Sequence, residues 1–435
     1  MSHTLRGWCG SAEHGLNRRG FLGTAAFAGA TAFATDMSIL NVLKSPVLAD
    51  EIKRQEKRVI LLWLAGGASQ LETWDPKPGR PTGGPFRAID TNVPGIRISE
   101  LMPRLAQRQH HTAIIRSLNT KNADHGGGTE LMDTGRPREP GLIYPDLGSI
   151  LARELARADS PVPDYVSMYT SSEGRHKGGP GFLGARYAPM FLDKGLIPEN
   201  IRRLEMISDL DHHERLNLRT LLSARFARAR ETSALGSHNS AYSRVRGLMG
   251  SEQLFDISQE PQAVRDKYGP TVFGEQVLVA RRLIEAGVPF VKVARAWWDS
   301  HGQNFETHLE LVSELDSVMS TLLDDLADRG LLEKTLVITL GEFGRTPQIN
   351  PSLGRDHFAA AWSASLSGCG IKGGVVYGKT DEDGNKVVDG EVGAEALFAT
   401  IFNALGIDHQ KNYHVGARPV PLTNPGTRPI PEVLA

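Results

Sequence analysis

Apolar residues along this chain fall into short continuous runs and into longer stretches with helical spacing. Four mostly apolar runs predict strands at 58–64, 112–117, 290–293 and 335–340. Apolar positions repeat every three or four residues at 144–158, 273–286 and 306–329, which predicts helices, and 393–406 predicts a closing helix. Strands that alternate with helices favour an α/β fold with a doubly wound, mostly parallel sheet and helices on both of its faces.

Three stretches depart from this alternation. Residues 199–269 are charged and poor in strand runs, which predicts an inserted helical subdomain or cap. Short runs on either side of Asp383-Gly384-Asn385 predict a small hairpin. The tail at 418–435 is rich in Pro and Gly and is expected to be an extended surface strap. The α/β domain is therefore expected at 50–417.

The first 49 residues are typical of an export signal. A twin-arginine pattern, NRRGFL, spans residues 17–22, and a small and apolar run follows at 23–33. Residues 47–49 offer a cleavage site. Because a membrane span needs about 20 apolar residues, this run is too short to anchor the mature chain. We expect export by the twin-arginine translocon, a periplasmic or other extracytoplasmic location, and no stable membrane span.

Composition excludes some functions. The chain has 435 residues, of which 40% are hydrophobic and 23% charged, as in ordinary globular proteins. Removing residues 1–49 takes four basic and two acidic residues from totals of 49 and 50, which leaves a net charge of −3. This balance gives no electrostatic support for nucleic-acid binding. Cys369 is the only cysteine after residue 49, so the mature chain cannot form an internal disulfide.

Polar residues follow each of the four predicted strands, and ligands of open α/β sheets bind beyond the carboxyl ends of the strands. After the first strand, Glu72 and Asp75 are either metal ligands or solvated acids of a tight turn. After the second strand, Asn122, Asp124, His125 and Thr129 surround three glycines that open a helix. The start of a helix attracts anions, so a nucleophile and an anion site are expected here. The alternative is that Asp124 only caps the helix.

The third and fourth strands are followed by the densest sets of ligand-type side chains. Asp299 and His301 can point the same way, and His308 lies at the start of the next helix. Imidazole favours zinc, iron or manganese over calcium. A hydrogen-bonded loop is the alternative. After the fourth strand, Glu342 offers a carboxylate, and the planar guanidinium of Arg345 fits phosphate, sulfate or carboxylate. The alternative is that Arg345 pairs with Glu342 and is structural.

A further segment, Gly354 to Phe358, supplies His357 as a ligand or proton donor and Asp356 as its orienter or as a ligand. Taken together, the catalytic candidates are Thr129, Asp124, His125 and His357, with Ser117 as a further candidate nucleophile, and the anion-binding candidates are Arg345 and Asn122. The candidate metal ligands are Asp75, Glu72, Asp299, His301, His308, Glu342, Asp356 and His357.

Seven segments of the chain resemble a family exported by the twin-arginine route, domain of unknown function 1501. They are NRRGFL, GGASQLETWDPKP, NADHGGG, WWDSHGQNFETH, LGEFGRTPQIN, GRDHF and GIKGGVVYG. That family is placed in the alkaline phosphatase and sulfatase superfamily. The resemblance implies a doubly wound α/β sheet that holds metals beside a Ser, Thr or formylglycine nucleophile. The first-strand acid would be Glu72 or Asp75, and the nucleophile would lie within 119–129.

The resemblance also implies that Asp299 forms a metal pair with His301 or His308, and that His357 is the last histidine. Active superfamily members typically carry Asp-His after the fourth strand, where this chain has Glu342-Phe343. The sulfatase motif Cys/Ser-x-Pro-x-Arg is absent from the sequence. The chain thus fits a variant with one divalent metal (zinc, manganese or calcium) or none.

Three functions remain open at this point. The first is an exported, metal-dependent hydrolase of phosphate or sulfate esters. The second is a non-catalytic protein that binds an anionic polysaccharide or small molecule on the same scaffold. The third is an exported structural protein with a relic site.

Overall fold

The computed structural model describes residues 56–157, 160, 162–169, 178–192, 195–198, 206–228, 242, 247 and 249–435. The chain divides into two compact units, residues 1–53 and 54–435. All described residues belong to the second unit. The export signal predicted at 1–49 lies outside the described residues and stays a prediction.

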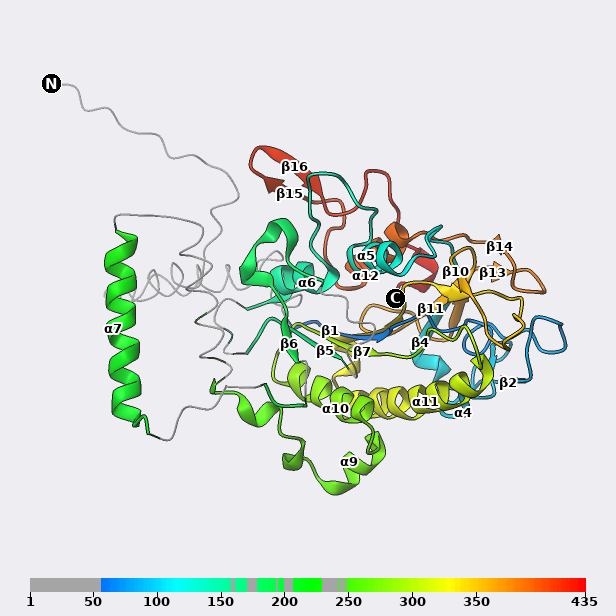
Figure 1. Ribbon diagram of the computed structural model, residues 1–435, viewed down its shortest axis with the longest axis horizontal. Helices are drawn as coiled ribbons and strands as arrows, with labels where there is room; N and C mark the ends of the chain where they lie inside the picture. The colour runs from blue at the N-terminus through cyan, green and yellow to red at the C-terminus, as the bar shows by residue number, and fades with distance from the viewer. Residues whose placement is uncertain are drawn as a thin grey trace, which may run out of the picture. The chain divides into compact units, whose positions relative to one another are not determined.

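The core of the fold is an eight-stranded sheet (Figure 1). Seven strands run parallel, and β11 is antiparallel to both of its neighbours, β4 and β8. The four predicted strands are β1, β4, β7 and β8. In order across the sheet, the strands are β12 (Val375–Tyr377), β4 (Thr112–Leu118), β11 (Trp362–Gly368), β8 (Thr335–Leu340), β1 (Arg58–Leu64), β7 (Phe290–Arg295), β5 (Tyr165–Tyr169) and β6 (Met190–Leu192).

Helices cover both faces of this sheet, because the side chains of its central strand alternate between two cores. Ile60 and Leu62 pack into one core with α10 (Val272–Glu285) and α11 (Asn304–Asp328). Val59 and Leu61 pack into the other, with α5 (His125–Thr134), α6 (Leu147–Leu155) and α12 (Ala394–Ala404). Figure 1 shows α10 and α11 on one side of the sheet, with α5, α6 and α12 on the other. The predicted doubly wound α/β class is confirmed.

Strand β11 was not predicted from the sequence. Its sequence, WSASLSG, contains serines at positions that are buried in the sheet, including Ser365 and Ser367. Ser367 Oγ lies 2.8 Å from Thr112 Oγ1 on the neighbouring strand. Small hydroxyl side chains can be buried in a sheet when such a partner is present, and a search for apolar runs does not find them.

In the part of the chain that the structure describes, four two-stranded sheets accompany the main sheet. They are β2 (Ala88–Asp90) with β3 (Arg97–Ser99), β9 (Gly344–Arg345) with β10 (His357–Phe358), β13 (Lys379–Thr380) with β14 (Val387–Asp389), and β15 (Asn412–Val415) with β16 (Arg418–Pro421). The hairpin expected around Asp383 to Asn385 is confirmed. Its first arm is β13, because the apolar run at 375–377 joins the main sheet instead as β12.

The remaining elements are short, except for α7. They are α4 (Pro103–Ala106), α7 (Asp209–Ala227), α9 (Gln262–Tyr268), η1 (Gln109–His111), η2 (Gly181–Leu183), η3 (Ala185–Tyr187), η4 (Glu252–Leu254), η5 (Ile257–Gln259), η6 (Leu332–Lys334) and η7 (Pro431–Val433). The described part of 199–269 therefore forms helices, and its status as an insertion stays a prediction. The tail differs from the expected surface strap, since Ile430 and Val433 are buried.

Within the described residues, none of the helices combines the length and apolarity needed to cross a membrane.

Candidate metal centre

Loops at one edge of the sheet bring four predicted residues together. His125 follows β4 as the first residue of α5, and Asp299 and His301 follow β7. His357, on β10, precedes the antiparallel strand β11 and so arrives at the same edge. We call these four residues the His/Asp cluster. Their strands lie near one another in the sheet, so the cluster occupies the crevice in which open α/β sheets bind ligands.

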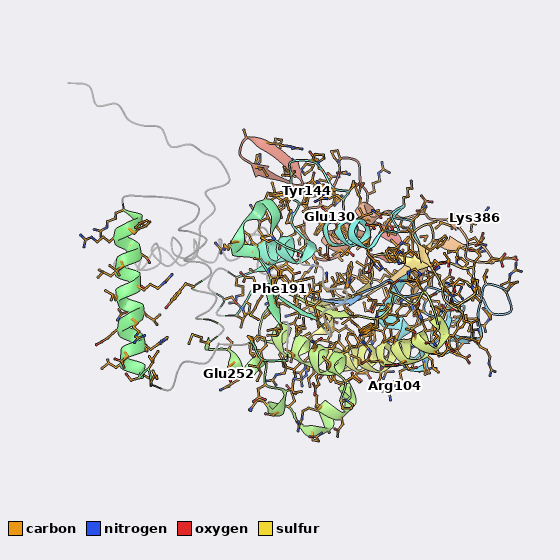
Figure 2. The ribbon with its side chains drawn as sticks, in the orientation of Figure 1. Arg104, Glu130, Tyr144, Phe191, Glu252 and Lys386 are labelled. Atoms are coloured by element: carbon orange, nitrogen blue, oxygen red, sulfur yellow. The ribbon has the colours of Figure 1, made fainter. Side chains whose placement is uncertain are left out.

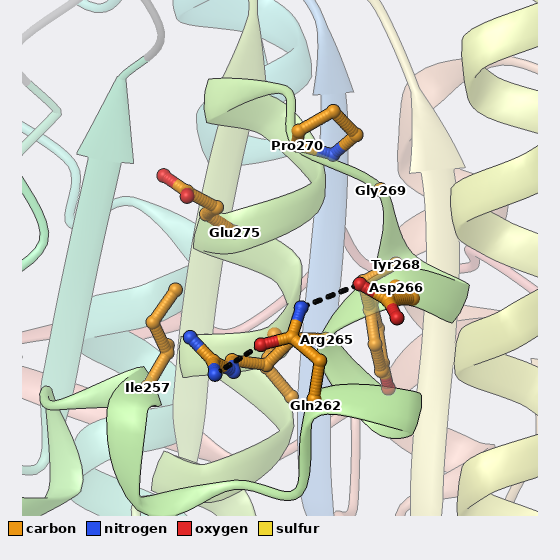
Figure 3. A pocket seen from close by; sticks show the side chains of 9 residues that line it. Ile257, Gln262, Arg265, Asp266, Tyr268, Gly269, Pro270 and Glu275 are labelled. Carbon is orange, nitrogen blue, oxygen red and sulfur yellow. Dashed lines mark hydrogen bonds between the residues drawn. The ribbon is translucent and has the colours of Figure 1, made fainter.

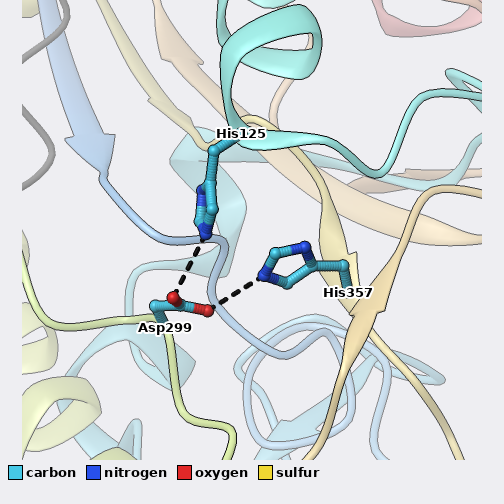
Figure 4. Close-up of side chains that lie close together, drawn as sticks. All are labelled: His125, Asp299 and His357. Carbon is cyan, nitrogen blue, oxygen red and sulfur yellow. Dashed lines mark hydrogen bonds and ion pairs between the residues drawn. The ribbon is translucent and has the colours of Figure 1, made fainter.

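Asp299 is the centre of the His/Asp cluster (Figure 4). Its Oδ2 lies 3.1 Å from His125 Nε2, and its Oδ1 lies 3.1 Å from His357 Nε2. His301 Nε2 is also 3.1 Å from Oδ1. One ligand atom from each of His125, Asp299 and His357 can be chosen so that all three lie within 4.8 Å of one another, which is close enough to hold one metal ion.

The other ring nitrogen of each histidine faces a hydrogen-bond acceptor. His125 Nδ1 lies 3.1 Å from Glu342 Oε1, and His301 Nδ1 lies 2.8 Å from Asp356 Oδ1. His357 Nδ1 lies 2.8 Å from the carbonyl oxygen of Ala123. Since carbonyl and carboxylate oxygens accept, each Nδ1 donates its hydrogen. In the neutral rings, every Nε2 therefore turns a lone pair toward Asp299.

This arrangement fits a metal ion. His301 Nε2 and His357 Nε2 are 3.0 Å apart, and both face a carboxylate oxygen. Lone pairs that converge on a carboxylate repel one another, and either a metal ion or, for His125 with its raised pKa, a ring proton removes this repulsion. Ligating histidines in proteins almost always donate the other ring N–H to a carboxylate or carbonyl, as all three do here. The donor set, two imidazoles and one carboxylate within the 4.8 Å group and the imidazole of His301 beside them, suits zinc and similar transition metals.

Charges around Asp299 keep it ionised. Burial alone would raise the pKa of Asp299, but the hydrogen bond and charge of Arg345, with contributions from His357 and His125, lower the pKa to about 2. The hydrogen bond to Glu342 raises the pKa of His125. Burial, with the charge of Arg345, lowers the pKa of His357, which favours its neutral, ligating form.

Phe343 forms an apolar floor under the His/Asp cluster. Its ring centroid lies 4.4 Å from that of His357 and 5.1 Å from that of His125. A Cβ atom on Gly67 would lie 2.7 Å from Phe343, so only glycine fits at that position. The residue that departs from the superfamily pattern thus packs against two of the candidate ligands.

Arg345 contacts the cluster through Asp299, from the buried side. The side chain is fully buried and donates to the carbonyl oxygens of Gly66, Gly67 and Arg355 and to Asp299 Oδ1. The side-chain amide of Gln70 also holds the backbone of Arg345, because its Nε2 donates to the Arg345 carbonyl and its Oε1 accepts from the Arg345 N–H. The guanidinium is held by the protein, so the structure does not present it to an external anion. Arg345 instead fixes the orientation of Asp299.

Strained backbone surrounds the cluster. Four described non-glycine residues have positive φ: Lys121 at 57°, Trp297 at 79°, Gln303 at 51° and Leu353 at 56°. Each lies within four residues of a member of the His/Asp cluster. Such conformations cost about 1–3 kcal/mol each and gather at functional sites. Their position supports a functional role for this edge of the sheet.

The two acids after the first strand lie in separate networks. Glu72 is fully buried and its Oε1 accepts 2.7 and 3.2 Å hydrogen bonds from the buried Arg355. Asp75 accepts from Lys77 Nζ at 3.1 Å and from Thr380. Neither carboxylate belongs to the group of metal-binding atoms around Asp299.

His308 also lies apart from that group. Its Nε2 accepts from Ser69 N at 2.9 Å, and its Nδ1 donates to the carbonyl oxygen of Asn304 at 2.8 Å. Burial lowers its pKa to about 4, so the ring is neutral. Nδ1 thus bonds within α11, and Nε2 joins this helix to the turn that follows β1.

The residues at the start of α5 have mainly local partners. Asp124 is the N-cap and accepts from Gly127 N at 2.7 Å, as the capping alternative expected. Asn122 Oδ1 accepts from Asp124 N at 3.0 Å. Thr129 is buried within α5. A cavity of about 630 Å³ lies beside this turn and is lined by Asn122, Asp124, Glu130 and Arg138, among others.

A smaller cavity, of about 240 Å³, lies between α9 and α10 (Figure 3). Its lining includes Arg265, which donates to Gln262, and none of the His/Asp cluster. We assign it no role in the candidate centre.

Two contributions to the centre were not found from the sequence. The carbonyl of Ala123 orients His357, and no side-chain pattern signals a backbone acceptor. Glu342 was expected as a metal ligand, whereas its Oε1 accepts from Gly66 N at 2.8 Å and orients His125. Its Oε2 is buried with no hydrogen-bond partner among the described residues.

Several solved structures are similar to this chain at low identity. A sulfatase from a Pseudoalteromonas species has a TM-score of 0.37 and 13% identity, over 83% of this chain and 71% of the sulfatase. The alkaline phosphatase from the Antarctic bacterium TAB5 has a TM-score of 0.36 and 12% identity, over 81% and 98%. Ps i-CgsB in complex with k-i-k-neocarrahexaose has a TM-score of 0.39 and 10% identity, over 81% and 72%.

No curated protein matches this chain in sequence. The family model described as protein of unknown function (DUF1501) matches residues 56–434, which include the whole sheet and the His/Asp cluster. The chain therefore belongs to the DUF1501 family of proteins of unknown function.

Proposed function

We propose that the protein is a one-metal hydrolase of phosphate or sulfate esters, with His125, His301, His357 and Asp299 as ligands. The observation that carries the proposal is the convergence of three imidazole Nε2 atoms on Asp299, each ring being held through Nδ1 by an acceptor. A divalent transition metal at this point would supply Lewis-acid chemistry, acidifying water and polarising an ester oxygen.

The openness of the cluster favours a catalytic over a purely structural centre. The side chains of Asp299, His125 and His301 are 40, 43 and 47% exposed. Structural zinc sites are closed by protein ligands, whereas catalytic sites keep a position open. A substrate can approach from the solvent side, while Phe343 and Arg345 close the opposite side.

Neighbouring residues set the charge and orientation of the candidate ligands. Arg345 keeps Asp299 ionised, and Glu342, Asp356 and the Ala123 carbonyl fix the tautomers of the three rings. The amino end of α5 lies at His125 and favours anions through its dipole, which suits a phosphate or sulfate group.

Water is the nucleophile that we propose. Asp124 caps α5, Thr129 is buried in the helix, and Ser117 is buried and donates to the Gly390 carbonyl. Within the described residues, none of these three side chains forms a hydrogen bond to the cluster, so attack by water requires the fewest rearrangements.

A non-catalytic binder of anionic glycans is the second candidate. The buried Phe343, at a position where active superfamily members are expected to carry a ligand, favours it. On this reading the metal would hold a sulfate or phosphate group without cleaving its ester.

Metal analysis and turnover distinguish these functions. The purified protein is analysed by mass spectrometry for zinc, manganese, iron and calcium, together with His125→Ala and His357→Ala. The control is His414→Ala, an exposed histidine on β15. We expect close to one metal per chain in the wild type and control and about 100-fold weaker binding in the cluster variants. Turnover of aryl phosphates or sulfates that is lost with chelator and restored with metal supports the hydrolase.

The other outcomes are equally informative. Stoichiometric metal with calorimetric binding of sulfated glycans and no turnover supports the second candidate. Equal metal content in the wild type and the two cluster variants would contradict both the hydrolase and the glycan-binding function.

We also propose export by the twin-arginine route, on the strength of the pattern at residues 17–22. Cell fractionation of the full chain should place it outside the cytoplasm. The double substitution Arg18→Lys and Arg19→Lys should retain it inside. Unchanged export of this variant would contradict the route.

A further inference from the structure

Helix α7 (Asp209–Ala227) turns its most apolar residues to solvent. Leu210, Leu218, Leu221 and Leu222 are 69, 58, 64 and 54% exposed. Figure 2 draws the side chains along the whole helix. A surface helix normally buries its apolar stripe against the core. Contiguous exposed apolar residues mark interaction surfaces.

The opposite face of α7 is the more buried one, although it is less apolar. Leu216 is buried, and His212, Arg219, Ser223 and Ala227 are half-buried. These five positions follow each other at three- and four-residue spacing, so they form one face of the helix. The face with four exposed leucines is therefore left for a partner.

Charges along one exposed row of α7 are divided between its two ends, and Arg215 lies to the side of this row. Asp211 and Glu214 lie in the first half, and Arg225 and Arg228 lie at the end. Positions 211, 214, 218, 221, 225 and 228 alternate in steps of three and four, which is the spacing of a coiled-coil seam. The seam reads Asp, Glu, Leu, Leu, Arg, Arg along the chain.

This seam is complementary to itself in the antiparallel direction. Leu218 then opposes Leu221, Glu214 opposes Arg225, and Asp211 opposes Arg228 of the second copy. All three pairs are centred on the same point, between Arg219 and Thr220. A parallel pair would instead place acid against acid and arginine against arginine, which is destabilising.

We propose that α7 pairs antiparallel with α7 of a second copy of this chain, around a two-fold axis, and forms a homodimer. A two-fold interface uses the same patch twice, as this seam allows. The 19-residue helix is about 28 Å long, so one helix pair gives an interface at the small end of the usual range. A reversible dimer with a dissociation constant in the micromolar range, on the order of 1–10 μM, is expected.

Charge reversal tests the pairing on the full chain. Sedimentation equilibrium measures the dimer dissociation constant of the wild type, Glu214→Arg, Arg225→Glu and the variant that combines both changes. Each single change places two pairs of like charges in the seam and should weaken the dimer by about tenfold or more. The combined variant restores opposite charges and should return to within about threefold of the wild type.

The control is Glu333→Arg, the same charge change at an exposed residue of η6. Circular dichroism confirms that all variants keep their helix content. A wild type that stays monomeric at about 100 μM, or that binds lipid vesicles as a monomer, would overturn the proposal. Single variants as tight as the control, or a combined variant as weak as the single ones, would overturn the antiparallel pairing.

Discussion

His301 and His357 face each other through Nε2 atoms that are 3.0 Å apart, while each ring donates its Nδ1 hydrogen to a different acceptor. The pair comes from segments 56 residues apart in sequence. With both Nδ1 hydrogens donated elsewhere, the two Nε2 atoms face a common point. If the proposed metal binds here, the carboxylate and carbonyl oxygens behind the rings should affect its affinity.

The acceptor behind His301 gives the first prediction. Asp356→Ala removes the carboxylate that fixes His301 Nδ1, and Asp356 is exposed, so the fold should be kept. We expect metal affinity to fall about 10–100-fold, because ring orientation and tautomer are no longer fixed. Competition with a chromogenic chelator measures it. Asp356→Asn keeps an acceptor oxygen and should lose less, and Glu310→Ala, exposed on α11, serves as the unaffected control. Equal affinity in all three variants would contradict this role.

Replacing the guanidinium group of Arg345 should destabilise the fold. Arg345→Lys keeps the charge but cannot reach three carbonyl oxygens and Asp299 together. We expect a loss of about 3–5 kcal/mol in the free energy of unfolding, because buried acceptors lose their donors. Urea denaturation measures it, with Arg87→Lys at an exposed site as the control. A loss no greater than that of the control would show that Arg345 is dispensable.

Gly66 is expected to be required for both stability and metal binding. Its φ is +109°, and a Cβ there would lie 2.4 Å from the backbone N of Asp299. Gly66→Ala should therefore displace Asp299 and lower metal affinity. Gly79 has φ +78° and nothing within 4 Å of its Cβ position, so Gly79→Ala isolates the backbone cost, about 1 kcal/mol. Chelator competition and urea denaturation compare the two. Similar behaviour of both variants would refute a special role for Gly66.

His308 should make the fold sensitive to acid. Its native pKa is about 4, whereas an unfolded histidine titrates near 6.5. Its contribution is therefore fully present above about pH 6.5 and is lost as the pH falls toward 4, because the unfolded chain binds the proton first. The loss is about 3 kcal/mol over this range.

The slope of the unfolding free energy against pH checks this prediction. His308→Gln should be less stable at pH 7, because the buried pairing with Ser69 and Asn304 changes. Between about pH 6.5 and 4, the free energy of unfolding of His308→Gln should fall less steeply with decreasing pH than that of the wild type. The difference in slope should correspond to about one proton bound on unfolding. Parallel curves for the wild type and His308→Gln would show that His308 does not titrate on unfolding.

Much of the fold could be predicted from the sequence, because β1, β4, β7 and β8 are apolar runs in a sheet covered on both faces. The helices α10 and α11 were predicted to within two residues, because their apolar positions repeat every three or four residues. Strand β11 could not, since buried serines interrupt its apolar run and one of them, Ser367, bonds Thr112 on the neighbouring strand. Local patterns carry no information about such distant partners.

The sequence by itself determined which chemical groups this edge of the sheet can offer. His125, Asp299 and His301 follow from strand ends and ligand-type residues, since parallel strands bring their carboxyl ends to one edge. His357 was a candidate by residue type, and the antiparallel β11 brings it to the same edge. Tertiary structure alone decided the roles. Arg345 and Glu342 look like an anion clamp and a ligand in the sequence, yet burial and hydrogen bonds turn one toward Asp299 and the other toward His125. His308 is neutral because it is buried, and its Nε2 accepts from the Ser69 N–H instead of facing a metal. Burial and partner geometry are properties of the folded chain, and they separate a ligand from the residue that positions it.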